Sequence, residues 1–443
     1  MIFSREKTRK RMDYLLLLGM IGLVLVGALC IMSAVNSLSW ANSIVRTHIV
    51  ALGVGIVAFF AGWSFNYQIY NEQYKPLYGF ILALLIGVLL FGSYQRGSRS
   101  WFVLPFFSMQ PSEICRVCTI LVAAAFLDRR RRKVGEVSSL VGLGLLLAPV
   151  FGLIMLQPDF SSVVVTLPAL LVLLYCAGAN MFYLSMGLLF IAVAGFFTIG
   201  WTYLYLNPSL TENWFFEIFY RLGHNVWYIL GFMVLVMLAS YVVWWFFKQL
   251  RYLVHPVYFV IATVVVFAGL FGGMFVDHHM KPHQRKRIET FLAPRSDPRG
   301  AGYNVLQAQI AMGAGGAWGK GLFSGTQSRL GFVPEKHTDF ILAVVGEELG
   351  LWGTCLVLGL YLLILGRIVF IGYTSGDRYG YLVCSGIFGM FLTYMLVNFG
   401  MLIGIVPVAG IPLPFISYGG SNLVASLWAL GVVQSVYARR LGI

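Results

Sequence analysis

Three acidic residues whose type and spacing suit chemistry lie within residues 331–350. Asp339 follows a short charged loop and begins a long apolar run, and Glu347 and Glu348 lie inside that run. Charged residues make up only 11% of the chain, so acids in or beside an apolar run need an explanation. A carboxylate at the position of Asp339 either complements a helix dipole or takes a proton from a sugar hydroxyl, and position alone leaves both open.

Helix geometry separates these acids. Asp339 and Glu347 are eight residues apart in the sequence, which gives about 12 Å of rise and roughly 80° of rotation in an α-helix. They cannot form a close carboxylate pair, so we expect Glu347 to be structural or to pair with another helix. Thr338 is a favourable N-cap that would put Asp339 in the first helical turn, facing an outer aqueous cavity. His337 does not face Asp339 well, so we expect no hydrolase triad.

A second polar group opens another apolar run. Gln110 and Glu113 lie at its start in the sequence Gln-Pro-Ser-Glu, and Arg116 follows three residues after Glu113. At this spacing Glu113 and Arg116 share one helix face, either as a structural ion pair or as the wall of a site. Asp159, in the sequence Gln-Pro-Asp between two further runs, is expected at the outer surface as a turn residue or a site residue.

Two other segments resemble ligand sites more weakly. The glycine-rich segment 313–325 carries Lys320, but Gly321 follows this lysine where a phosphate-binding loop has Ser or Thr. Contact of its backbone with a diphosphate stays open, because glycines allow close approach. Asp277, His278, His279 and His283 match no strong metal template. Residues 407–422 contain three prolines and three glycines, which predicts a broken helix that lines a cavity or is covered by protein.

The rest of the chain must hold these residues in a membrane. Of its 443 residues 59% are hydrophobic, and the mean hydropathy is +0.81. This composition excludes a soluble globule and predicts a single all-α, polytopic membrane domain, because only helices and closed barrels satisfy their backbone in lipid and no alternating barrel pattern is present. About twelve spans are expected, near 14–34, 47–64, 77–92, 112–127, 139–156, 160–177, 181–201, 227–247, 253–276, 339–366, 380–403 and 415–437.

The net charge of +14 reflects topology and gives no reason to expect a nucleic acid partner. Basic residues gather in the first eleven residues, at Arg129–Lys133 and at Arg439 and Arg440. This is a positive-inside pattern, so both termini are expected in the cytoplasm and the first run is expected to be an uncleaved span. The six cysteines fall in apolar runs, so we expect no disulfide framework and interpret Cys115 and Cys118 as packing residues.

Two loops on the predicted outer side are unusually basic. The loop 93–111 carries Arg99, and the long loop 277–338 carries nine Lys or Arg residues against four acids, including Lys320 and Lys336. Long loops partly escape the positive-inside rule, which is one explanation. The other is an outer face that binds an anion such as a lipid-linked phosphate.

Several motifs occur together in one order along most of the chain. They are Gly97–Trp101, Gln110–Glu113, Leu156–Asp159, Gln284–Ile288, Gly300–Tyr303, Gly319–Gly321, Gly325–Ser328, Pro334–Phe340, Gly346–Gly350 and Gly410–Ser421. This series resembles the family of shape, elongation, division and sporulation (SEDS) proteins, which includes RodA and FtsW, and the segments after residue 318 are more similar to RodA.

The resemblance implies a peptidoglycan glycosyltransferase that polymerises lipid II outside the plasma membrane, in cell elongation, with a class B penicillin-binding transpeptidase. The essential acid of the family falls on Asp339, its supporting glutamate on Glu113 and its basic loop residue on Lys320. Further supporting residues are expected within the motifs, at Arg99, Gln110, Arg116, Asp159, Lys336, His337 and Ser417.

The sequence departs from the family pattern in a few places. Arg116 stands where a lysine is usual, Ser100 stands where many members have arginine, and Phe160-Ser161-Ser162 replaces Leu-Gly-Thr. The largest departure is an expected inserted segment, 202–276, that adds two spans to the ten of the family.

The implied reaction is glycosyl transfer from a polyprenyl diphosphate. Asp339 would be the general base on the acceptor hydroxyl, and Lys320, Arg99 and loop arginines would offset charge on the leaving diphosphate, with a divalent cation (Mg or Mn) left open. Two alternatives stay open. Glu347, Glu348 and the broken segment 407–422 also suit a flippase or transporter of a lipid-linked precursor, and a non-catalytic scaffold for cell-wall synthases needs no base at all.

Overall fold

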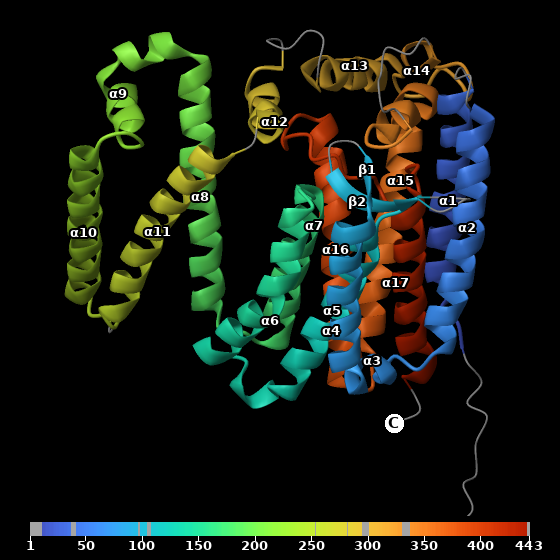
Figure 1. Ribbon diagram of the computed structural model, residues 1–443, viewed down its shortest axis with the longest axis horizontal. Helices are drawn as coiled ribbons and strands as arrows, with labels where there is room; N and C mark the ends of the chain where they lie inside the picture. Colours follow the sequence, from blue (N-terminus) through green and yellow to red (C-terminus); the bar gives the residue numbers. More distant parts are fainter. Residues whose placement is uncertain are drawn as a thin grey trace, which may run out of the picture. The chain divides into compact units, whose positions relative to one another are not determined.

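The computed structural model describes residues 11–36, 41–95, 98–103, 108–252, 254–280, 282–294, 301–329 and 337–440 (Figure 1). A long helix stands at each of the twelve predicted spans, which confirms the all-α membrane fold. These helices are α1 (Tyr14–Val35), α2 (Ala41–Ser64), α4 (Tyr74–Phe91), α5 (Pro111–Arg129), α6 (Val137–Leu156), α7 (Phe160–Ala177), α8 (Met181–Leu206), α10 (Val226–Gln249), α11 (Val257–His279), α15 (Ile341–Tyr373), α16 (Arg378–Leu402) and α17 (Gly420–Arg439).

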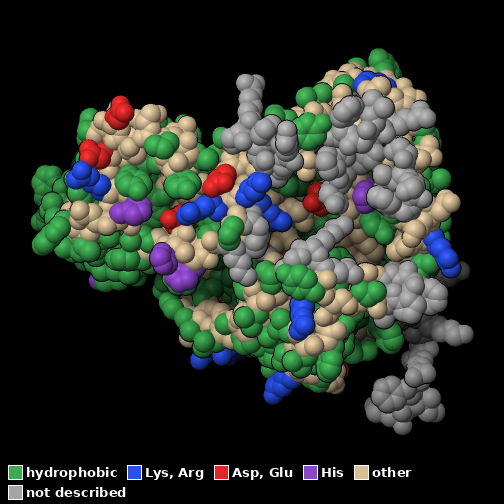
Figure 2. Space-filling view, turned by 45° about the horizontal axis from the view of Figure 1, so that its top comes forward, with side chains coloured by type: hydrophobic (Ala, Val, Ile, Leu, Met, Phe, Trp, Pro, Cys, Tyr) green, Lys and Arg blue, Asp and Glu red, His purple; other side chains and the backbone are tan. Residues whose placement is uncertain are grey.

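Ten of these helices, among the described residues, are long and apolar enough to cross a membrane. The other two are α5, whose sequence contains Glu113, Arg116, Asp128 and Arg129, and α7, whose apolar run is shorter. Hydrophobic side chains, green in Figure 2, cover much of the molecular surface. Such a surface is unfavourable in water and suits helices that face lipid.

The connections contain the short elements. A three-stranded antiparallel sheet in the order β1 (Ser93–Gln95), β2 (Ser98–Val103) and β3 (Ser108–Met109) precedes α5. The predicted long loop 277–338 holds three helices, α12 (Pro282–Leu292), α13 (Ala301–Ala314) and α14 (Thr326–Arg329). The remaining short helices are α3 (Gln68–Glu72), α9 (Trp214–Arg221) and the 3₁₀ turns η1 (Arg131–Lys133) and η2 (Pro208–Glu212).

The chain divides into two compact units. The first contains residues 1–179 and 304–443, and the second contains residues 180–303. The predicted insertion, 202–276, lies inside the second unit, whose core packs Phe197, Trp201 and Leu270 together. Every candidate site residue in the described part of the chain belongs to the first unit.

Close helix packing builds the first unit. Lipid tails give no hydrophobic drive for helices to associate, so small residues that let backbones approach are the usual means. A Cβ added at Gly431 of α17 would lie 2.3 Å from the carbonyl oxygen of Phe59 in α2, and one at Gly62 of α2 would lie 2.9 Å from that of Trp428. Larger side chains at these glycines would separate the two helices.

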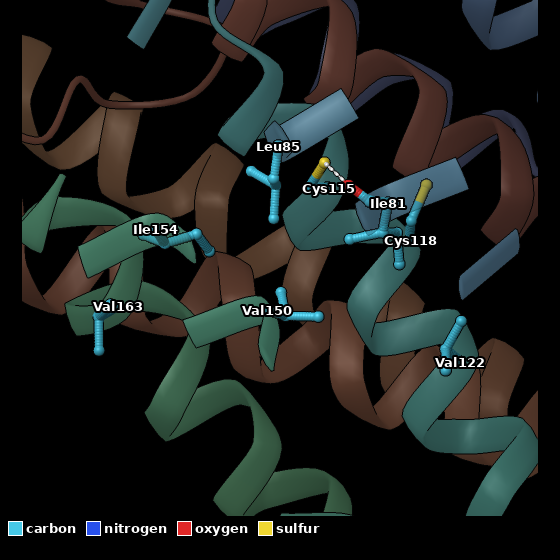
Figure 3. Packing of buried hydrophobic residues seen from close by; sticks show 8 residues of the cluster. All are labelled: Ile81, Leu85, Cys115, Cys118, Val122, Val150, Ile154 and Val163. Atoms are coloured by element: carbon cyan, nitrogen blue, oxygen red, sulfur yellow. Dashed lines mark hydrogen bonds between the residues drawn. The ribbon is translucent and has the colours of Figure 1, made fainter. Parts of the chain in front are cut away.

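A second packed cluster joins α4, α5, α6 and α7 (Figure 3). Its buried members are Ile81, Leu85, Cys115, Cys118, Val122, Val150, Ile154 and Val163. The prediction that Cys115 and Cys118 are packing residues is confirmed, because both thiols are unoxidised and buried, and the Cys115 Sγ lies 3.9 Å from the Ile81 carbonyl oxygen.

The start of α1 and the end of α17 lie at the same end of the first unit (Figure 1). The Asp13 N–H donates to the Gln434 side chain, whose amide donates back to the Asp13 carbonyl, each at 2.9 Å. Arg367 donates from Nε to the Asp13 carboxylate at 3.1 Å. Near this end the basic cluster after α5 begins, where Arg129 donates to the Asn71 carbonyl at 2.6 Å.

Candidate functional site

The polar residues at the start of α5 are placed by β3 and Pro111. The Gln110 N–H donates to Ser421 Oγ at 2.7 Å, and Pro111, at the first helical position, lets α5 begin at once. Glu113 then falls in the first turn, and Arg116 Nη1 lies 2.7 Å from its Oε2 with both side chains buried. The predicted i,i+3 ion pair is confirmed.

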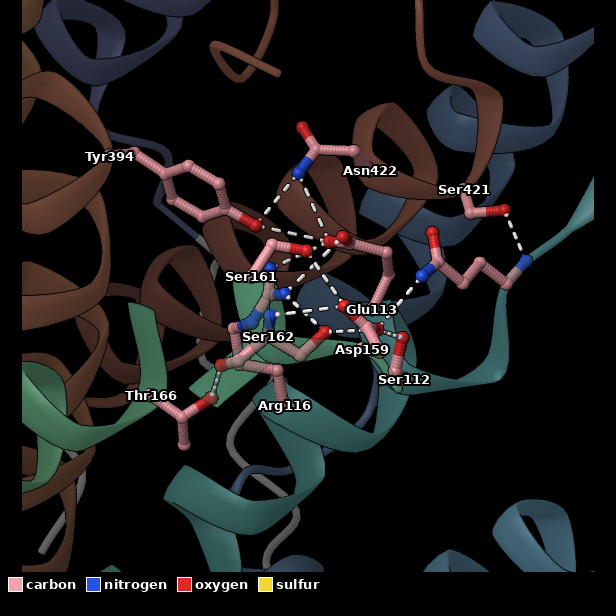
Figure 4. A network of polar contacts seen from close by, with 11 residues as sticks. Ser112, Glu113, Arg116, Asp159, Ser161, Ser162, Thr166, Tyr394, Ser421 and Asn422 are labelled. Carbon is pink, nitrogen blue, oxygen red and sulfur yellow. Dashed lines mark hydrogen bonds and ion pairs between the residues drawn. The ribbon is translucent and has the colours of Figure 1, made fainter. Parts of the chain in front are cut away.

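Glu113 also connects α5 to two other helices (Figure 4). Its Oε2 accepts hydrogen bonds from the Tyr394 hydroxyl of α16 and the Asn422 amide of α17, each at 3.0 Å. The Asn422 amide donates to the Tyr394 oxygen as well, at 2.8 Å. A buried carboxylate that accepts this many hydrogen bonds is held in one orientation, which favours a positioning role for Glu113 over proton transfer.

Asp159 belongs to the same buried network, so its predicted place at the surface is wrong. It caps α7, and its side chain is only 7% exposed. The hydroxyls of Ser112, Ser161 and Ser162 donate to its oxygens at 2.6 to 2.7 Å, and the Gln110 amide donates at 2.8 Å. Burial raises the pKa of Asp159, but the hydrogen bonds from these serines and the charge of Arg116 outweigh it, so the pKa lies below its ordinary value.

Arg116 links the two acids. Its Nη2 donates to Ser162 Oγ at 3.0 Å, and Ser162 in turn donates to Asp159 at 2.6 Å. One guanidinium therefore balances two buried carboxylates through a bidentate contact and a hydroxyl bridge. We call the set Gln110, Ser112, Glu113, Arg116, Asp159, Ser162, Tyr394 and Asn422 the α5 network. It joins α5, α7, α16 and α17 by charge-assisted hydrogen bonds.

A second polar cluster forms where α15 is interrupted. Gly350 has φ 67° and ψ −161°, so the helix is broken there, and the glycine-rich segment 313–325 fills the break. Cβ atoms at Gly315 and Gly319 would lie 1.9 and 2.2 Å from carbonyl oxygens of α15, so only glycines fit. The backbone hydrogen bonds are Lys320 N to Glu347 O, Gly321 N to Glu348 O, Leu351 N to Gly316 O and Trp352 N to Ala317 O.

These contacts decide what the glycine-rich segment does. The N–H groups of Lys320 and Gly321 donate to α15 at 3.0 Å each, so they are not available to cradle a diphosphate. The Lys320 ammonium lies 3.2 Å from Glu347 Oε1 and donates to Thr326 Oγ1 at 2.6 Å. Glu347 is fully buried; it forms an ion pair with Lys320 of this segment and also accepts hydrogen bonds from α14, in line with the expected structural role or pairing with another helix.

Glu348 completes this cluster from the other side. Its Oε1 accepts from Ser33 Oγ of α1 at 2.5 Å, and its Oε2 accepts from the Phe323 N–H at 3.2 Å. The Gln327 N–H, in α14, donates to Glu347 Oε1 at 2.7 Å. We call Lys320, Thr326, Gln327, Glu347 and Glu348 the α15 cluster; it fixes α14 and the glycine-rich segment to the membrane helices.

Asp339 lies in the turn 337–340 just before α15, and its side chain is partly exposed. The prediction that Thr338 caps the helix is wrong, because Phe340 occupies the cap position with no side-chain hydrogen bond and α15 begins at Ile341. The turn is held instead by the broken segment after α16. The Tyr418 N–H donates to the His337 carbonyl at 2.8 Å, and the two rings are 5.5 Å apart.

The predicted break between α16 and α17 is confirmed, since residues 403–419 are not helical. Ser417 is buried there, and its Oγ accepts from the Leu413 N–H at 2.8 Å, so it shapes the turn before Tyr418. Lys336 lies outside the described residues. Arg99 is exposed on β2, where it pairs with β1, and it forms no ion pair with a described residue.

The structure therefore brings four predicted residues together: Gln110, Glu113, Arg116 and Asp159. It places Lys320 beside the break in α15 and Asp339 in the turn before α15. Sequence reasoning missed Tyr394 and Asn422. Asn422 directly follows a family motif, which was a usable signal, whereas Tyr394 is one aromatic residue among many in an apolar helix. No group of three or more His, Cys, Asp or Glu residues in the described part of the chain is arranged to hold a metal ion.

Comparison with known proteins finds the same family along nearly the whole chain. A model of the FtsW, RodA and SpoVE family, described as cell cycle protein, matches residues 10–215 and 218–441. The peptidoglycan glycosyltransferase RodA of Treponema pallidum is 33% identical over 442 residues, which cover 97% of this chain and 98% of the relative. The peptidoglycan glycosyltransferase MrdB of Escherichia coli K12 is 30% identical over 430 residues, covering 97% and 94%.

Solved structures have a similar fold. A structure described as "Structural coordination of polymerization and crosslinking by a peptidoglycan synthase complex" matches with a TM-score of 0.66 and 26% identity, covering 98% of this chain and 99% of that chain. The rod shape determining protein RodA of Thermus thermophilus matches with a TM-score of 0.59 and 24% identity, covering 98% of each chain. The second match supports the fold alone.

Proposed function

Since this chain belongs to the FtsW, RodA and SpoVE family, we propose that it is a peptidoglycan glycosyltransferase that polymerises lipid II at the outer face of the plasma membrane. Two relatives at 30% identity or more, over nearly the full length, carry the name peptidoglycan glycosyltransferase. The observation that carries the site is a partly exposed carboxylate, Asp339, in the turn before α15. The four acids of the other motifs, Glu113, Asp159, Glu347 and Glu348, are buried and accept hydrogen bonds.

Asp339 is the general base of this proposal. It takes the proton from an acceptor sugar hydroxyl as the hydroxyl oxygen bonds to the anomeric carbon of the donor. The bond from that carbon to the diphosphate oxygen breaks, and the polyprenyl diphosphate leaves with the electron pair, with inversion at the carbon. Each of these steps is assigned to side chains of this chain.

The remaining motif residues have supporting roles in the proposal. The α5 network positions the ends of α5, α7, α16 and α17, and Ser417 and His337 hold the turn that carries Asp339. Arg99 is the exposed cation available to the leaving diphosphate, and Lys336 is a second basic residue beside Asp339 in the sequence. Lys320 acts mainly by seating the glycine-rich segment against α15, since its ammonium already pairs with Glu347.

Topology and partner follow from the same proposal. In this proposal the end of the first unit that holds Asp13, Gln434 and the basic cluster after α5 faces the cytoplasm, and the segment 277–338 is extracytoplasmic. The chain works in cell elongation beside a class B penicillin-binding transpeptidase, a partner suggested by the synthase complex with the similar structure.

Substitution of Asp339 tests the proposal. The purified Asp339→Asn protein, assayed with its transpeptidase partner in detergent, is expected to polymerise lipid II about 10²–10⁴-fold more slowly, because the acceptor loses its base. Asp128→Asn is the matched control, since Asp128 lies at the far end of α5 and accepts a hydrogen bond from Asn71. Unchanged thermal unfolding shows that Asp339→Asn is folded.

Three outcomes contradict the proposal. If folded Asp339→Asn polymerises lipid II at the wild-type rate, Asp339 is not the general base. Loss of elongation in the absence of sealed vesicles, with normal movement of lipid II across vesicle membranes, identifies a transporter. Polymerisation that persists only when the partner has its own polymerase domain identifies a scaffold.

A further inference from the structure

A groove between α10 and α11 lies apart from every site residue, in the second unit of the chain. Its volume is about 280 Å³. These two helices are the spans that the sequence predicts as additional to the ten of the family. The groove is lined by apolar and aromatic side chains, chiefly Met237, Tyr241 and Trp244 of α10 and Phe259, Val260 and Val264 of α11.

The groove exists because the two helices diverge. α11 packs on α8, where Cβ atoms at Gly269 and Gly273 would meet the side chain of Val193 at 2.7 Å and the carbonyl oxygen of Ala194 at 3.0 Å. α10 buries only Ile229. One polar contact, from Thr263 Oγ1 to Ser240 Oγ at 2.7 Å, ties the two helices together. Four of the apolar lining side chains are exposed: Met237, Tyr241, Val260 and Val264.

The end of the groove nearest the α10–α11 turn is positively charged. The Lys248 ammonium lies 5.3 Å from the ring centroid of Trp244, a lining residue, and Arg251 is exposed in the turn with φ 59°. The sequence contains no Asp or Glu between Glu217 and Asp277, and neither cation forms an ion pair with a described residue. An anion at this end would therefore meet two uncompensated cations.

The length of the groove matches one leaflet of a bilayer. Along α11 the lining residues run from Pro256, the N-cap, to Phe267, eleven residues later, which is about 16 Å of helix rise. Half of the hydrocarbon core of a membrane is about 15 Å. A partner transmembrane helix needs an apolar strip through both leaflets, about 30 Å long, which this groove does not offer.

We propose that the α10–α11 groove binds one anionic phospholipid. An acyl chain lies between the two helices along Tyr241 and Val260, and the phosphate contacts Lys248 and Arg251 at the membrane surface. The two cations select the lipid charge, and the groove selects a chain that stays in one leaflet. This site is independent of glycosyl transfer and gives the additional helix pair a function in sensing membrane composition.

Native mass spectrometry of the full-length protein, released from detergent after incubation with phosphatidylglycerol or phosphatidylcholine, tests the proposal. We expect one phosphatidylglycerol to be retained in preference to phosphatidylcholine. The Lys248→Gln/Arg251→Gln double variant is expected to bind phosphatidylglycerol roughly 30-fold more weakly, since each basic residue near the surface contributes about 1 kcal/mol. Val260→Trp, which fills the groove and keeps both cations, is expected to abolish retention. Arg131→Gln/Arg132→Gln, two exposed basic residues in η1 of the first unit, is the control and should leave retention unchanged.

Each other result overturns the proposal. Equal retention of the two lipids shows that the cations do not select charge. If the Lys248→Gln/Arg251→Gln variant loses phosphatidylglycerol but Val260→Trp retains it, the lipid binds to a basic surface patch and not in the groove. Equal loss with the η1 control shows non-specific attraction, and full retention by all variants places the lipid elsewhere. Circular dichroism and thermal unfolding confirm that the variants keep the wild-type fold.

Discussion

The α5 network and the α15 cluster each hold a buried acid among membrane helices, but the partners of the two acids come from different parts of the structure. Glu113 sits in an unbroken helix and draws its partners from Arg116 of its own helix and from α16 and α17. Glu347 sits at a break in its helix and draws its partner from a glycine-rich segment that enters the break.

The charge partners differ in exposure as well. The Arg116 side chain is 3% exposed, whereas the Lys320 side chain is 29% exposed. A cation buried between helices cannot be released without separating them, but a cation on an inserted segment can be released if that segment moves. The α5 network therefore joins the helices of the bundle to one another, whereas the α15 cluster attaches the glycine-rich segment 313–325 to them.

Removal of Arg116 is expected to have the largest effect. Arg116→Met leaves Glu113 and Asp159 buried without their cation, a change that costs about 3–5 kcal/mol in buried ion pairs. Thermal unfolding of the purified protein should show a large loss of stability, and Glu113→Gln/Arg116→Met should recover part of it. An Arg116→Met protein as stable as the wild type would show that the packing of α5 and α7 does not depend on the Arg116 guanidinium.

Gly319 tests how tightly the inserted segment fits. Gly319→Ala adds a Cβ that would lie 2.2 Å from the Glu348 carbonyl oxygen at φ +77°, so we expect a loss of about 2–4 kcal/mol from overpacking and backbone strain. Gly316→Ala is the matched control, since Gly316 also has a positive φ of +58° but no atom within 4 Å of the added Cβ. Its loss should be about 1–2 kcal/mol, from the left-handed conformation alone. Equal losses would mean that the segment does not need close contact with α15.

Lys320 gives the direct contrast with Arg116. Lys320→Met should cost only about 1–2 kcal/mol, because its ammonium is partly screened by solvent and the Thr326 hydroxyl and the Gln327 N–H still donate to Glu347. A double-mutant cycle with Glu347→Gln measures the coupling between the two side chains, and limited proteolysis at the glycine-rich segment reports its release. A loss as large as that of Arg116→Met would contradict the distinction drawn between the two clusters.

The sequence predicts the fold well because membrane helices leave a strong local signal. All twelve spans were placed from apolar runs, and the pair Glu113 and Arg116 followed from helix periodicity alone. The first helical residue of α15 was missed because Thr338 has the composition of a cap, while tertiary contact of His337 with Tyr418 sets the turn instead. The prediction rests on the local preference of threonine for the N-cap position, whereas the tertiary contact between His337 and Tyr418 sets the observed turn.

The candidate site is less predictable, because its contacts join distant parts of the chain. Asp159 follows a proline between two spans, which indicates a surface turn, and nothing in its neighbourhood shows that Gln110 and Ser112 will bury it. The partner of Glu347 lies 27 residues earlier in a segment whose glycines suggest phosphate binding. Glycines allow close approach by any group, so the same glycine-rich sequence fits contact with an interrupted helix and contact with a diphosphate.

The smallest effect concerns the protons of the α5 network. The pKa of Asp159 is lower in the folded protein than its ordinary value, so this carboxylate adds stability above an unfolded pKa of about 3.9, and that stability is lost as the pH falls through the folded pKa. Ser162→Ala removes the hydrogen bond from its hydroxyl and the bridge to Arg116, which raises the folded pKa and lowers stability by about 0.5–1.5 kcal/mol at neutral pH, since the donors Ser112, Ser161 and Gln110 remain. The difference in stability between Ser162→Ala and the wild type should therefore shrink as the pH falls below about 4 and on through the lower pKa of Asp159 in the folded wild type, where Asp159 becomes protonated in both proteins. Thermal unfolding between neutral pH and pH 3 measures this difference, and Ser138→Ala, which removes an exposed hydrogen bond to Glu136, is the control. A difference that is independent of pH would mean that Ser162 acts through packing and not through the charge of Asp159, and the α5 network would then owe its stability to Glu113 and Arg116 alone.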